Sequence, residues 1–344
     1  MSDEIQREKD EVLKQYSELQ QAVTLSDLLE TITDTTTAVT ELPARIKALR
    51  DRGYAFAGYL EGKADILAKQ WEAIANDARR VARQKTTDLT NDLNEIEDKA
   101  TNLTNAQGIA AKTYINQVEP VIKRIKSDVE AATKQIQSTC GEIPNNVQQT
   151  KTQIESIETY LQLAEEASFK LNAAECVFMA VEAEWEDHKD KPDGIFFITD
   201  QRVIMEQKEK TGKMLGMFGG KMQHQVLWEA PIGSIDEVSH ENKGLFGGVD
   251  LIHLKMGAGS QFAKLSLEVK GGIKAEWFAA QLKRASTGGL EKERGLKVDE
   301  ALIDAIANAP TICPVCGATF DDPIVAGMTQ IKCKYCGGVT RLAL

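Results

Sequence analysis

The sequence predicts a multidomain α+β protein with three folded parts in series, on three observations. Residues 1–175 are rich in Ala, Gln and Thr and carry apolar residues at three- and four-residue steps. Residues 176–286 hold short β-prone runs between turns, and four of the six cysteines follow near the C-terminus. We therefore expect a long α-helical coiled-coil or bundle region, a small β-barrel capped by a helix, a linker with a short helix over 287–310, and a zinc-binding unit over 311–344.

Apolar residues in the first part follow helical periods. Ile5, Val12 and Leu19 recur every seven residues. A clearer stripe comprises Val118, Ile122, Ile125, Val129, Ala132 and Ile136, and a further stripe comprises Val147, Ile154, Ile157, Leu161 and Ala164. This spacing places each set on one face of a helix, as in bundles and coiled coils. The pattern predicts several long antiparallel helices.

Glycine and proline mark where these helices are expected to begin or end. Gly141 and Pro144 lie between the last two stripes and predict a hairpin turn or a kink. Pro43 and Pro120 are expected in first helical turns, where the N–H that proline lacks has no partner to lose.

The apolar stripes have two interpretations, which the residues leave open. They fit a bundle within one chain. They also fit self-association, because Thr, Ala or Gln occupies many heptad positions and weakens the closure of a monomer. The aromatic-rich stretch RGYAFAGYLEGK, residues 52–63, is either a site of close packing or an apolar patch that meets a partner or lipid.

From Cys176 onward the pattern changes to short strands. The β-prone runs are CVFMAVEAEW, GIFFITDQRVIMEQ, HQVLWEAP, VDLIHLKM and FAKLSLEVK. Within the second run, two extended segments meet at residues 199–202, as in a hairpin. The helix-forming stretch IKAEWFAAQLKRA follows the strands. Its apolar face is expected to plug the open end of a barrel and comprises Ile273, Trp277, Phe278 and Leu282.

The strand series, its closing helix and the hairpin phrase TDQRVI resemble the pleckstrin-homology-like and GRAM-like domains of bacterial proteins. The resemblance covers residues 176–286 and implies a small barrel closed by its last helix. It also implies docking to a protein partner or a membrane surface, although the segment has no clear basic phosphoinositide signature.

The segment CPVCGATFDDPIVAGMTQIKCKYCGG, residues 313–338, carries two CxxC pairs with the spacing of a four-thiolate zinc site. The candidate ligands are Cys313, Cys316, Cys333 and Cys336. Gly317 and Gly337 permit the backbone turn after each pair, and the phrases CPVCG and CKYCG resemble the knuckles of the zinc-ribbon family. Four thiolates complete a tetrahedral shell, so we expect one structural Zn²⁺. The alternatives are a disulfide pair or a redox CxxC.

Composition and motifs argue against several classes of function. The net charge of −11 argues against bulk electrostatic attraction to nucleic acid or anionic lipid. No apolar run approaches the ~18 residues of a membrane span, and the start MSDEIQREKD does not resemble a signal peptide. The four histidines fit no metal or catalytic motif, and MLGMFGGKM departs from the phosphate-loop pattern. We expect a cytoplasmic protein, peripheral to the membrane at most, with no enzymatic activity and no small-molecule substrate.

Two glycine-flanked loops in the strand region, KMLGMFGGKM and NKGLFGGVD, place bulky apolar residues beside lysines. The candidate contact residues are Leu215, Met217, Phe218, Leu245, Phe246, Lys213, Lys221 and Lys243. One interpretation is a shared contact surface for a membrane or another subunit; the other is that the loops fold back over an open barrel edge.

Together these features predict a non-enzymatic scaffold or adaptor. It is expected to self-associate through its helices and to dock a partner or membrane surface through its barrel domain. The alternative is a nucleic-acid-binding protein that acts through the zinc ribbon. Asp321, Asp322 and the acidic chain weigh against that alternative, whose candidate residues are Lys332, Lys334, Tyr335 and Arg341.

Overall fold

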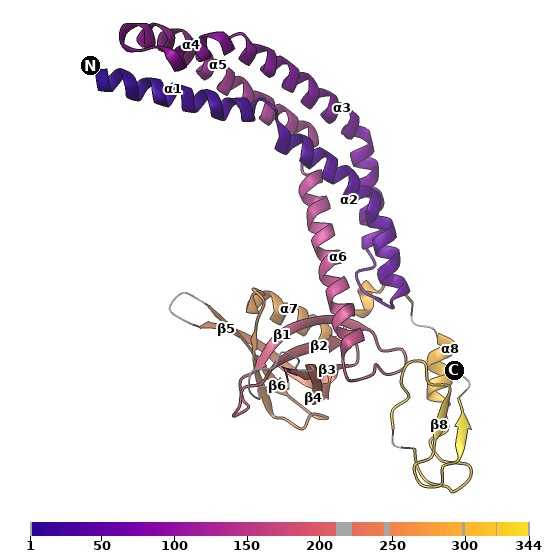
Figure 1. The fold of residues 1–344 in the computed structure, drawn as a ribbon. Coiled ribbons are helices and arrows are strands. Elements are labelled where there is room, and N and C mark those ends of the chain that lie inside the picture. The colour runs from indigo at the N-terminus through magenta and orange to yellow at the C-terminus, as the bar shows by residue number, and fades with distance from the viewer. Residues whose placement is uncertain (1, 211–221, 244–247, 298–299, 321, 343–344) are drawn as a thin grey trace. The chain divides into compact units, whose positions relative to one another are not determined.

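The computed structural model forms two compact units, each built from two stretches of the chain (Figure 1). The described residues are 2–210, 222–243, 248–297, 300–320 and 322–342. The first unit comprises Met1–Arg45 and Glu61–Thr152, and the second comprises Ile46–Leu60 and Gln153–Leu344. The domain boundaries that the sequence suggests stay predictions.

The first part of the chain is helical, as predicted. Its helices are α1 (Ser2–Ala22), α2 (Ser26–Asp51), α3 (Leu60–Asn94), α4 (Glu97–Asn105), α5 (Gly108–Cys140) and α6 (Ile143–Glu166). The predicted stripes on α5 and α6 are buried within this chain, except for the half-buried Val129 and Ala164. Small residues take part in this packing, since Ala78, Ala82 and Thr150 are fully covered. The stripes therefore support the interpretation as an intrachain bundle, and a coiled coil is not shown.

Two predicted helix starts are wrong. Pro43 lies inside α2 and Pro120 lies inside α5. Each proline is itself exposed and lies beside a continuous buried stripe, which includes Leu42 in α2 and Ile122 in α5. Packing along these stripes outweighs the ~3 kcal/mol that an interior proline costs a helix.

The predicted break near Gly141 is present. α5 ends at Cys140, and Gly141 follows with a positive φ of 58°. Its N–H donates to the carbonyl oxygen of Gln137 at 2.9 Å, before α6 begins at Ile143. The helical pattern is therefore interrupted between α5 and α6, as the sequence predicts.

The second unit contains a seven-stranded antiparallel sheet with the order β4-β3-β2-β1-β7-β6-β5. Its strands are β1 (Val177–Trp185), β2 (Asp193–Thr199), β3 (Arg202–Lys210), β4 (Met222–Pro231), β5 (Ile235–Lys243), β6 (Val249–Met256) and β7 (Lys264–Val269). A short 3₁₀ turn, η1 (Ile232–Ser234), joins the two edge strands β4 and β5. These strands do not pair with each other in the described residues, so a closed barrel is not shown.

Helix α7 (Ala275–Ser286) follows the sheet, as predicted, but its buried face differs from the expected one. Phe278 and Leu282 are buried, whereas Trp277 is 48% exposed and Ile273 precedes the helix. Small residues complete the face instead, namely Ala275, Ala279 and Ala285. Strand β5 was not predicted, because most of its side chains are exposed and polar.

Strand β2 is buried on both faces, which explains its continuous IFFI run. Phe196 packs toward α7, with its ring centroid 6.1 Å from that of Phe278. Phe197 faces the other way and contacts Phe169 edge to face at 4.9 Å, beside the C-terminal end of α6. The sheet is therefore covered by helical or connecting segments on both sides.

Residues 54–57 of the aromatic-rich stretch belong to the core of the second unit. The Phe56 ring meets Phe178 of β1 edge to face, with centroids 5.5 Å apart. The Gly58 N–H donates to the Glu293 carbonyl at 2.8 Å, and the Gly295 N–H donates to the Ala55 carbonyl at 2.7 Å. These contacts cover Tyr54 and Phe56 within the chain, so the two rings form no exposed patch.

The hairpin phrase TDQR holds the segment that connects α6 to β1. The Arg202 guanidinium binds the fully buried carboxylate of Glu175 with two bonds, of 2.9 and 3.0 Å. The Thr199 hydroxyl donates to the same carboxylate at 2.7 Å, and the Asn172 N–H donates to it at 2.6 Å. Arg202 also donates to the Lys170 carbonyl at 2.7 Å. Both carboxylate oxygens of Glu175 thus accept hydrogen bonds, as a buried ion pair requires.

A second ion pair of the hairpin holds the segment after α7. Asp200 pairs with Arg294, which follows the 3₁₀ turn η2 (Glu291–Glu293). The Cys176 N–H donates to Asp200 at 2.9 Å. Burial raises the pKa of Asp200, although this N–H and the Arg294 guanidinium oppose the shift.

We expect replacement of Gly58 by Ala to lower the free energy of unfolding by about 1–3 kcal/mol. The added Cβ would lie 2.8 Å from the Cα and N atoms of Gly295, which are backbone atoms held by hydrogen bonds. Gly62→Ala is the matched control, because Gly62 faces open space in α3 and alanine favours helices. Urea unfolding measures both variants; equal stability of the two would contradict the close approach.

Replacement of Arg202 by Met should destabilise the protein by about 3–5 kcal/mol, because it leaves the buried Glu175 carboxylate without its cation. The double variant Glu175→Gln/Arg202→Met should recover part of that loss. Lys47→Met, which removes an exposed pair with Asp51, should change stability by less than about 0.5 kcal/mol. Thermal and urea unfolding report all three, and a stable Arg202→Met variant would contradict the role of the pair.

Candidate functional site

The C-terminal unit brings its two CxxC pairs into matching turns. The Gly317 N–H donates to the Cys313 carbonyl at 2.9 Å, and the Gly337 N–H donates to the Cys333 carbonyl at 2.9 Å. Both glycines have positive φ, 74° and 72°. Such backbone favours glycine, as the sequence predicts. The short strands β8 (Gln330–Lys332) and β9 (Val339–Arg341) pair beside the second turn.

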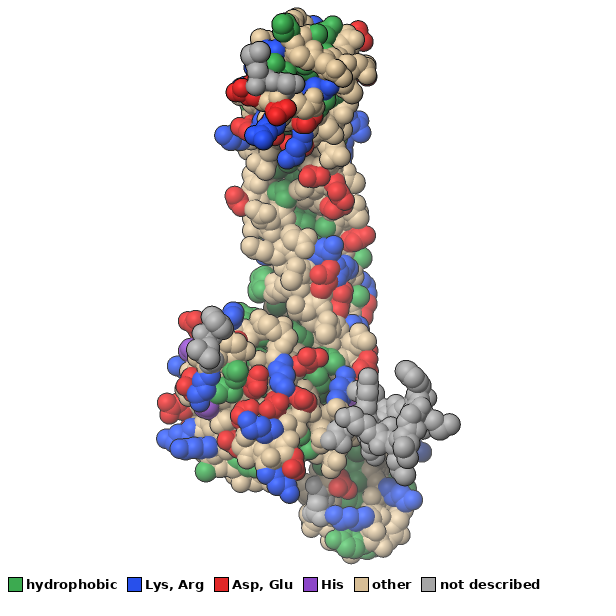
Figure 2. All heavy atoms as spheres, turned by 60° about the vertical axis from the view of Figure 1, so that its left-hand side comes forward, with side chains coloured by type: hydrophobic (Ala, Val, Ile, Leu, Met, Phe, Trp, Pro, Cys, Tyr) green, Lys and Arg blue, Asp and Glu red, His purple; other side chains and the backbone are tan. Residues whose placement is uncertain are grey.

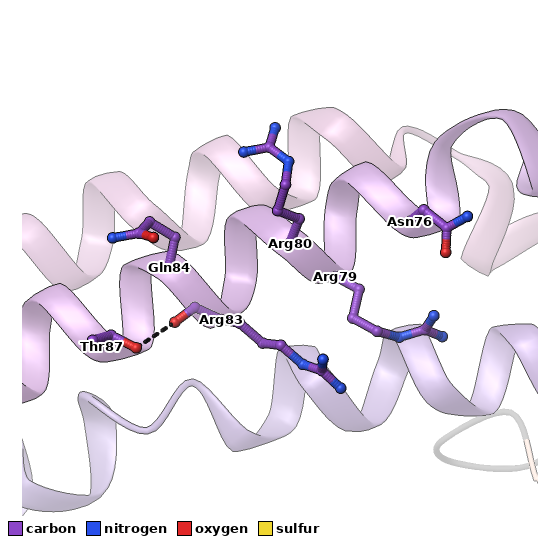
Figure 3. Close-up of a pocket in the computed structure, with 6 residues that line it drawn as sticks. All are labelled: Asn76, Arg79, Arg80, Arg83, Gln84 and Thr87. Atoms are coloured by element: carbon purple, nitrogen blue, oxygen red, sulfur yellow. Dashed lines mark hydrogen bonds between the residues drawn. The ribbon is translucent and has the colours of Figure 1, made fainter.

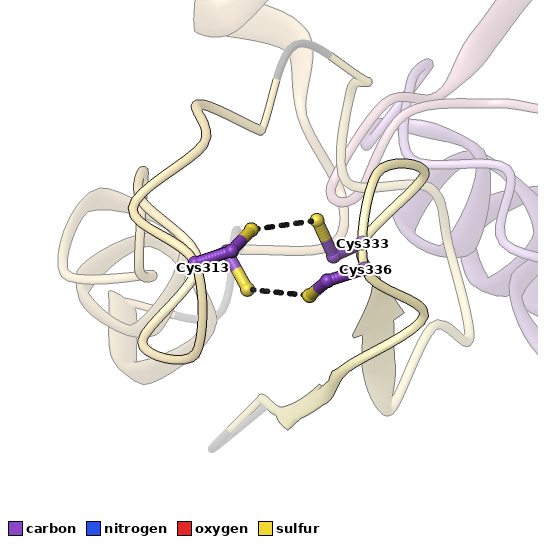
Figure 4. Close-up of side chains that lie close together, drawn as sticks. Cys313, Cys333 and Cys336 are labelled. Atoms are coloured by element: carbon purple, nitrogen blue, oxygen red, sulfur yellow. Dashed lines mark hydrogen bonds between the residues drawn. The ribbon is translucent and has the colours of Figure 1, made fainter.

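The four cysteine sulfurs lie within 4.8 Å of one another (Figure 4). The Sγ atoms of Cys313 and Cys336 are 3.7 Å apart, and those of Cys316 and Cys333 are 3.6 Å apart. A disulfide needs about 2.05 Å, so these distances exclude S–S bonds in this structure. Tetrahedral ligands about 2.3 Å from one ion stand roughly 3.8 Å apart. The cluster therefore has the dimensions of a four-thiolate metal site.

Backbone N–H groups help to prepare these thiols for a cation. The N–H groups of Cys336 and Tyr335 lower the pKa of Cys333 to about 7. At Cys316 the Ala318 N–H acts in the same direction, but hydrogen bonds with the other cysteines outweigh it and raise the pKa to about 12. A bound cation would favour the thiolate form of all four.

The four-cysteine unit is attached to the segment before β1 by backbone pairing. The Ala173 N–H donates to the Ile324 carbonyl at 2.8 Å, and the Ala326 N–H donates to the Leu171 carbonyl at 3.0 Å. A cleft of about 540 Å³ lies beside this pairing. Helix α8 (Glu300–Ala307) lines it with Ile303 and Ile306, opposite the polar groups of Arg294. The unit is therefore seated on the sheet domain and is not joined only by its linker.

The four-cysteine unit has an exposed face that is defined here by its exposed apolar and basic side chains. Val315 and Tyr335, one from each CxxC turn, are 71% and 70% exposed. Lys332 stands opposite Val339, and Arg341 stands opposite Gln330, so all four point outward from the two strands. Lys334 lies 5.7 Å above the Tyr335 ring. This face is suited to recognising another molecule.

Most of the predicted contact loops lie outside the described residues. This holds for Lys213, Leu215, Met217, Phe218, Lys221, Leu245 and Phe246. Lys243 is described: it ends β5, is exposed, and pairs with Glu241 at 3.0 Å. The contact surface therefore stays a prediction.

Sequence reasoning missed the partners of TDQR and a group of three carboxylates. Glu175 lies 27 residues before its partner Arg202, and Arg294 lies 94 residues after its partner Asp200. No local motif marks either residue. Glu184, Glu186 and Glu268 place carboxylate oxygens within 4.8 Å. Lys270 and Lys191 already bind two of them, at 2.8 and 2.6 Å. That group is therefore a network of ion pairs.

The histidines lie in separate surroundings. His224 contacts the buried Glu206 at 3.1 Å, and His253 contacts Ser266 at 3.1 Å. His188 stacks near Trp185, with ring centroids 4.9 Å apart. Glu206 is also held by the Ser168 hydroxyl and N–H. Each of these polar groups is occupied by a structural contact.

None of the helices in the described ranges is long and apolar enough to cross a lipid bilayer.

We expect purified protein to carry about one equivalent of zinc, and Cys316→Ser to lose most of it, because three thiolates leave the tetrahedral shell incomplete. Cys176→Ser is the matched control, since Cys176 is a free thiol of the same unit outside the cluster. Metal analysis of the two variants measures the effect. Undiminished zinc in a variant that lacks all four clustered cysteines would contradict the assignment of these cysteines as zinc ligands.

Acidification should also release the metal, since protons compete with the metal ion for the thiolates.

Comparisons with known proteins find low similarity. No family model matches the sequence, and no curated protein matches it. Among solved structures, the chain is similar to the Vps36 N-terminal PH domain, with 14% identity over 34% of this chain and 83% of that chain and a TM-score of 0.24. A pleckstrin homology domain from Shewanella amazonensis SB2B is 22% identical over 37% of this chain and 97% of that chain, with a TM-score of 0.25.

A third similar structure is human RhoA in complex with the DH/PH fragment of PDZRHOGEF, at 11% identity over 82% of this chain and 94% of that chain, with a TM-score of 0.27. Such scores carry no argument about function. The sheet domain is therefore described by its own antiparallel strand order and by the helix α7 that follows it.

Proposed function

We propose that this protein is a non-enzymatic scaffold or adaptor that docks a protein partner or a membrane surface. The observation that carries the proposal is the exposed face of the four-cysteine unit, seated on the sheet domain by backbone pairing. Large exposed apolar side chains beside basic ones are typical of recognition surfaces. The pairing with residues 171–173 keeps that face in a fixed position on the sheet domain.

The four cysteines hold one structural zinc ion in this proposal. Sulfur separations of 3.6 and 3.7 Å support it, since they agree with the tetrahedral value of about 3.8 Å. Four protein ligands leave no position for a reactive water. The ion would stabilise a unit too small to bury much apolar surface by itself. Its role is then to keep the recognition face folded.

A non-enzymatic role is part of the same proposal. In the described part of the chain, His188, His224 and His253 and the buried acids Glu175 and Glu206 are engaged in structural contacts. A catalytic site would need a nucleophile or base directed into an accessible pocket. The cleft beside α8 is lined by an arginine already bound to Asp200 and Glu291. We assign this cleft no chemistry.

Self-association through the helical region completes the scaffold proposal. The apolar stripes pack within one chain, so association has to use residues that remain exposed. Ile109 at the start of α5 is 86% exposed, and Ile66 of α3 is 58% exposed. Both belong to the first unit. Exposed isoleucines on helices supply apolar contact area for a second copy.

A nucleic-acid-binding protein is the second candidate, favoured by one observation. Lys332 and Arg341 share the outward face of β8 and β9, and Lys334 lies over the exposed ring of Tyr335. Basic groups beside an exposed aromatic ring suit single-stranded nucleic acid, because bases stack on the ring while phosphates meet the cations. An oligonucleotide mobility shift that Tyr335→Ala abolishes would favour this candidate over the adaptor.

We expect sedimentation velocity to show concentration-dependent association of the full chain. Ile109→Glu should weaken it roughly tenfold, because burying an isoleucine contributes about 1.5 kcal/mol or more. The new carboxylate stands in the first turn of α5, where a helix tolerates negative charge. Thr113→Glu, an exposed position one turn further on, is the matched control. A chain that stays monomeric at every accessible concentration would remove self-association from the proposal.

A further inference from the structure

A basic face on α3 has no part in the function proposed above. Six residues line a hollow of about 650 Å³: Asn76, Arg79, Arg80, Arg83, Gln84 and Thr87 (Figure 3). Their three- and four-residue spacing places them along one side of the helix. Buried alanines at 75, 78 and 82 mark the opposite, packed side. Each lining side chain carries a hydrogen-bond donor, and none carries a carboxylate.

The acids near this face bind Arg80 and Gln84 and leave Arg79 and Arg83, the two central arginines, without an acidic partner among the described residues. Asp77 pairs with Arg80 at 2.5 Å, and Asp88 accepts a bond from Gln84 at 2.8 Å. Arg79 donates to the Thr36 hydroxyl of α2 at 3.3 Å. Among the residues that the structure describes, no carboxylate lies within 4.0 Å of the Arg79 or Arg83 guanidinium. These two cations therefore have no anionic partner in the part of the chain that the structure describes.

Arg79 and Arg83 stand one helical turn apart and leave α3 on the same side, as Figure 3 shows. Like charges at this spacing destabilise a helix. The chain contains 52 acidic residues against 41 Lys and Arg, and Lys123 and Arg124 of α5 do have acidic partners. An external anion between the two arginines would remove the repulsion. The hydrogen bond to Thr36 holds the Arg79 side chain in its orientation before any anion binds.

The side chains at this face suit phosphate. A guanidinium offers parallel N–H donors that match two oxygens of one phosphate group. The amide of Asn76 stands one turn before Arg79 and adds a neutral donor. From Asn76 to Thr87 the face extends for roughly 17 Å along the helix axis, at about 1.5 Å per residue. An open face of this length can meet more than one phosphate group.

We propose that Arg79 and Arg83 bind phosphate groups, carried either by phospholipid headgroups or by a small phosphate compound in solution. The site uses neither the glycine-flanked loops nor the four-cysteine unit. Its success or failure is therefore independent of the adaptor proposal and of self-association.

The test compares the full-length protein with the Arg79→Gln/Arg83→Gln variant. Glutamine keeps a polar side chain at each exposed position and removes both charges. Lys123→Gln/Arg124→Gln is the matched control, because it removes two charges from α5 that Glu119, Asp92 and Asp128 already pair. Two probes are used at 0.15 M salt: pyrophosphate, by titration calorimetry, and phosphatidylcholine vesicles with and without phosphatidic acid, by flotation. Circular dichroism verifies that each variant is folded.

We expect the parent to bind at least one probe, and the Arg79/Arg83 variant to bind it at least tenfold more weakly, with the control unchanged. Binding to phosphatidic acid vesicles alone identifies a headgroup site, and binding to pyrophosphate identifies a site for soluble phosphate. The proposal is overturned if the parent binds neither probe, or if both variants lose binding equally. A DNA oligonucleotide that binds through the two arginines while neither phosphate probe does so also overturns it. If the double variant is unfolded, Arg83→Gln alone provides the same comparison.

Discussion

The buried pair of Arg202 and Glu175 is the interaction on which the second unit depends. It joins the β2–β3 hairpin to the segment before β1, and that segment in turn pairs with the four-cysteine unit through residues 171–173. A buried ion pair stabilises a fold only when its remaining oxygens and N–H groups are satisfied. Here Thr199 and two backbone groups supply those bonds. The pair thus fixes where three segments meet.

Local motifs could be predicted from the sequence, and so could the element types that strong periodicity marks. The CxxC pairs, the β2–β3 hairpin and the helical first part are signalled by residues close together in the chain. Strand β5 could not be found in this way, because its exposed side chains carry no alternation and its position comes from pairing with β6. Likewise, Pro43 and Pro120 signal helix starts locally, but packing of the surrounding stripes decides their place.

The candidate sites differ in the same way: some follow from local sequence, and others depend on contacts between distant segments. The four candidate metal ligands follow from the spacing of the cysteines, because each CxxC turn brings two sulfurs together and only the two turns then have to meet. The outward face of β8 and β9 depends on strand register, which the residues alone do not give. The basic run of α3 is visible in the sequence, but the partners of its arginines depend on where the side chains lie in the fold. Among the described residues Arg79 and Arg83 have no carboxylate partner, since the nearby Asp77 pairs with Arg80 and Asp88 accepts a hydrogen bond from Gln84.

The placement of residues 46–60 in the second unit has a consequence for synthesis of the chain. Phe56 leaves the ribosome well before its partner Phe178, and Gly58 precedes Glu293 by more than 230 residues. At 5–20 residues per second, the last of these partners arrives roughly 10–50 s later. During that interval Tyr54 and Phe56 are uncovered, although the helices of the first unit are complete earlier. The sheet domain is consequently no continuous module: a fragment that begins at residue 176 would lack part of its own core.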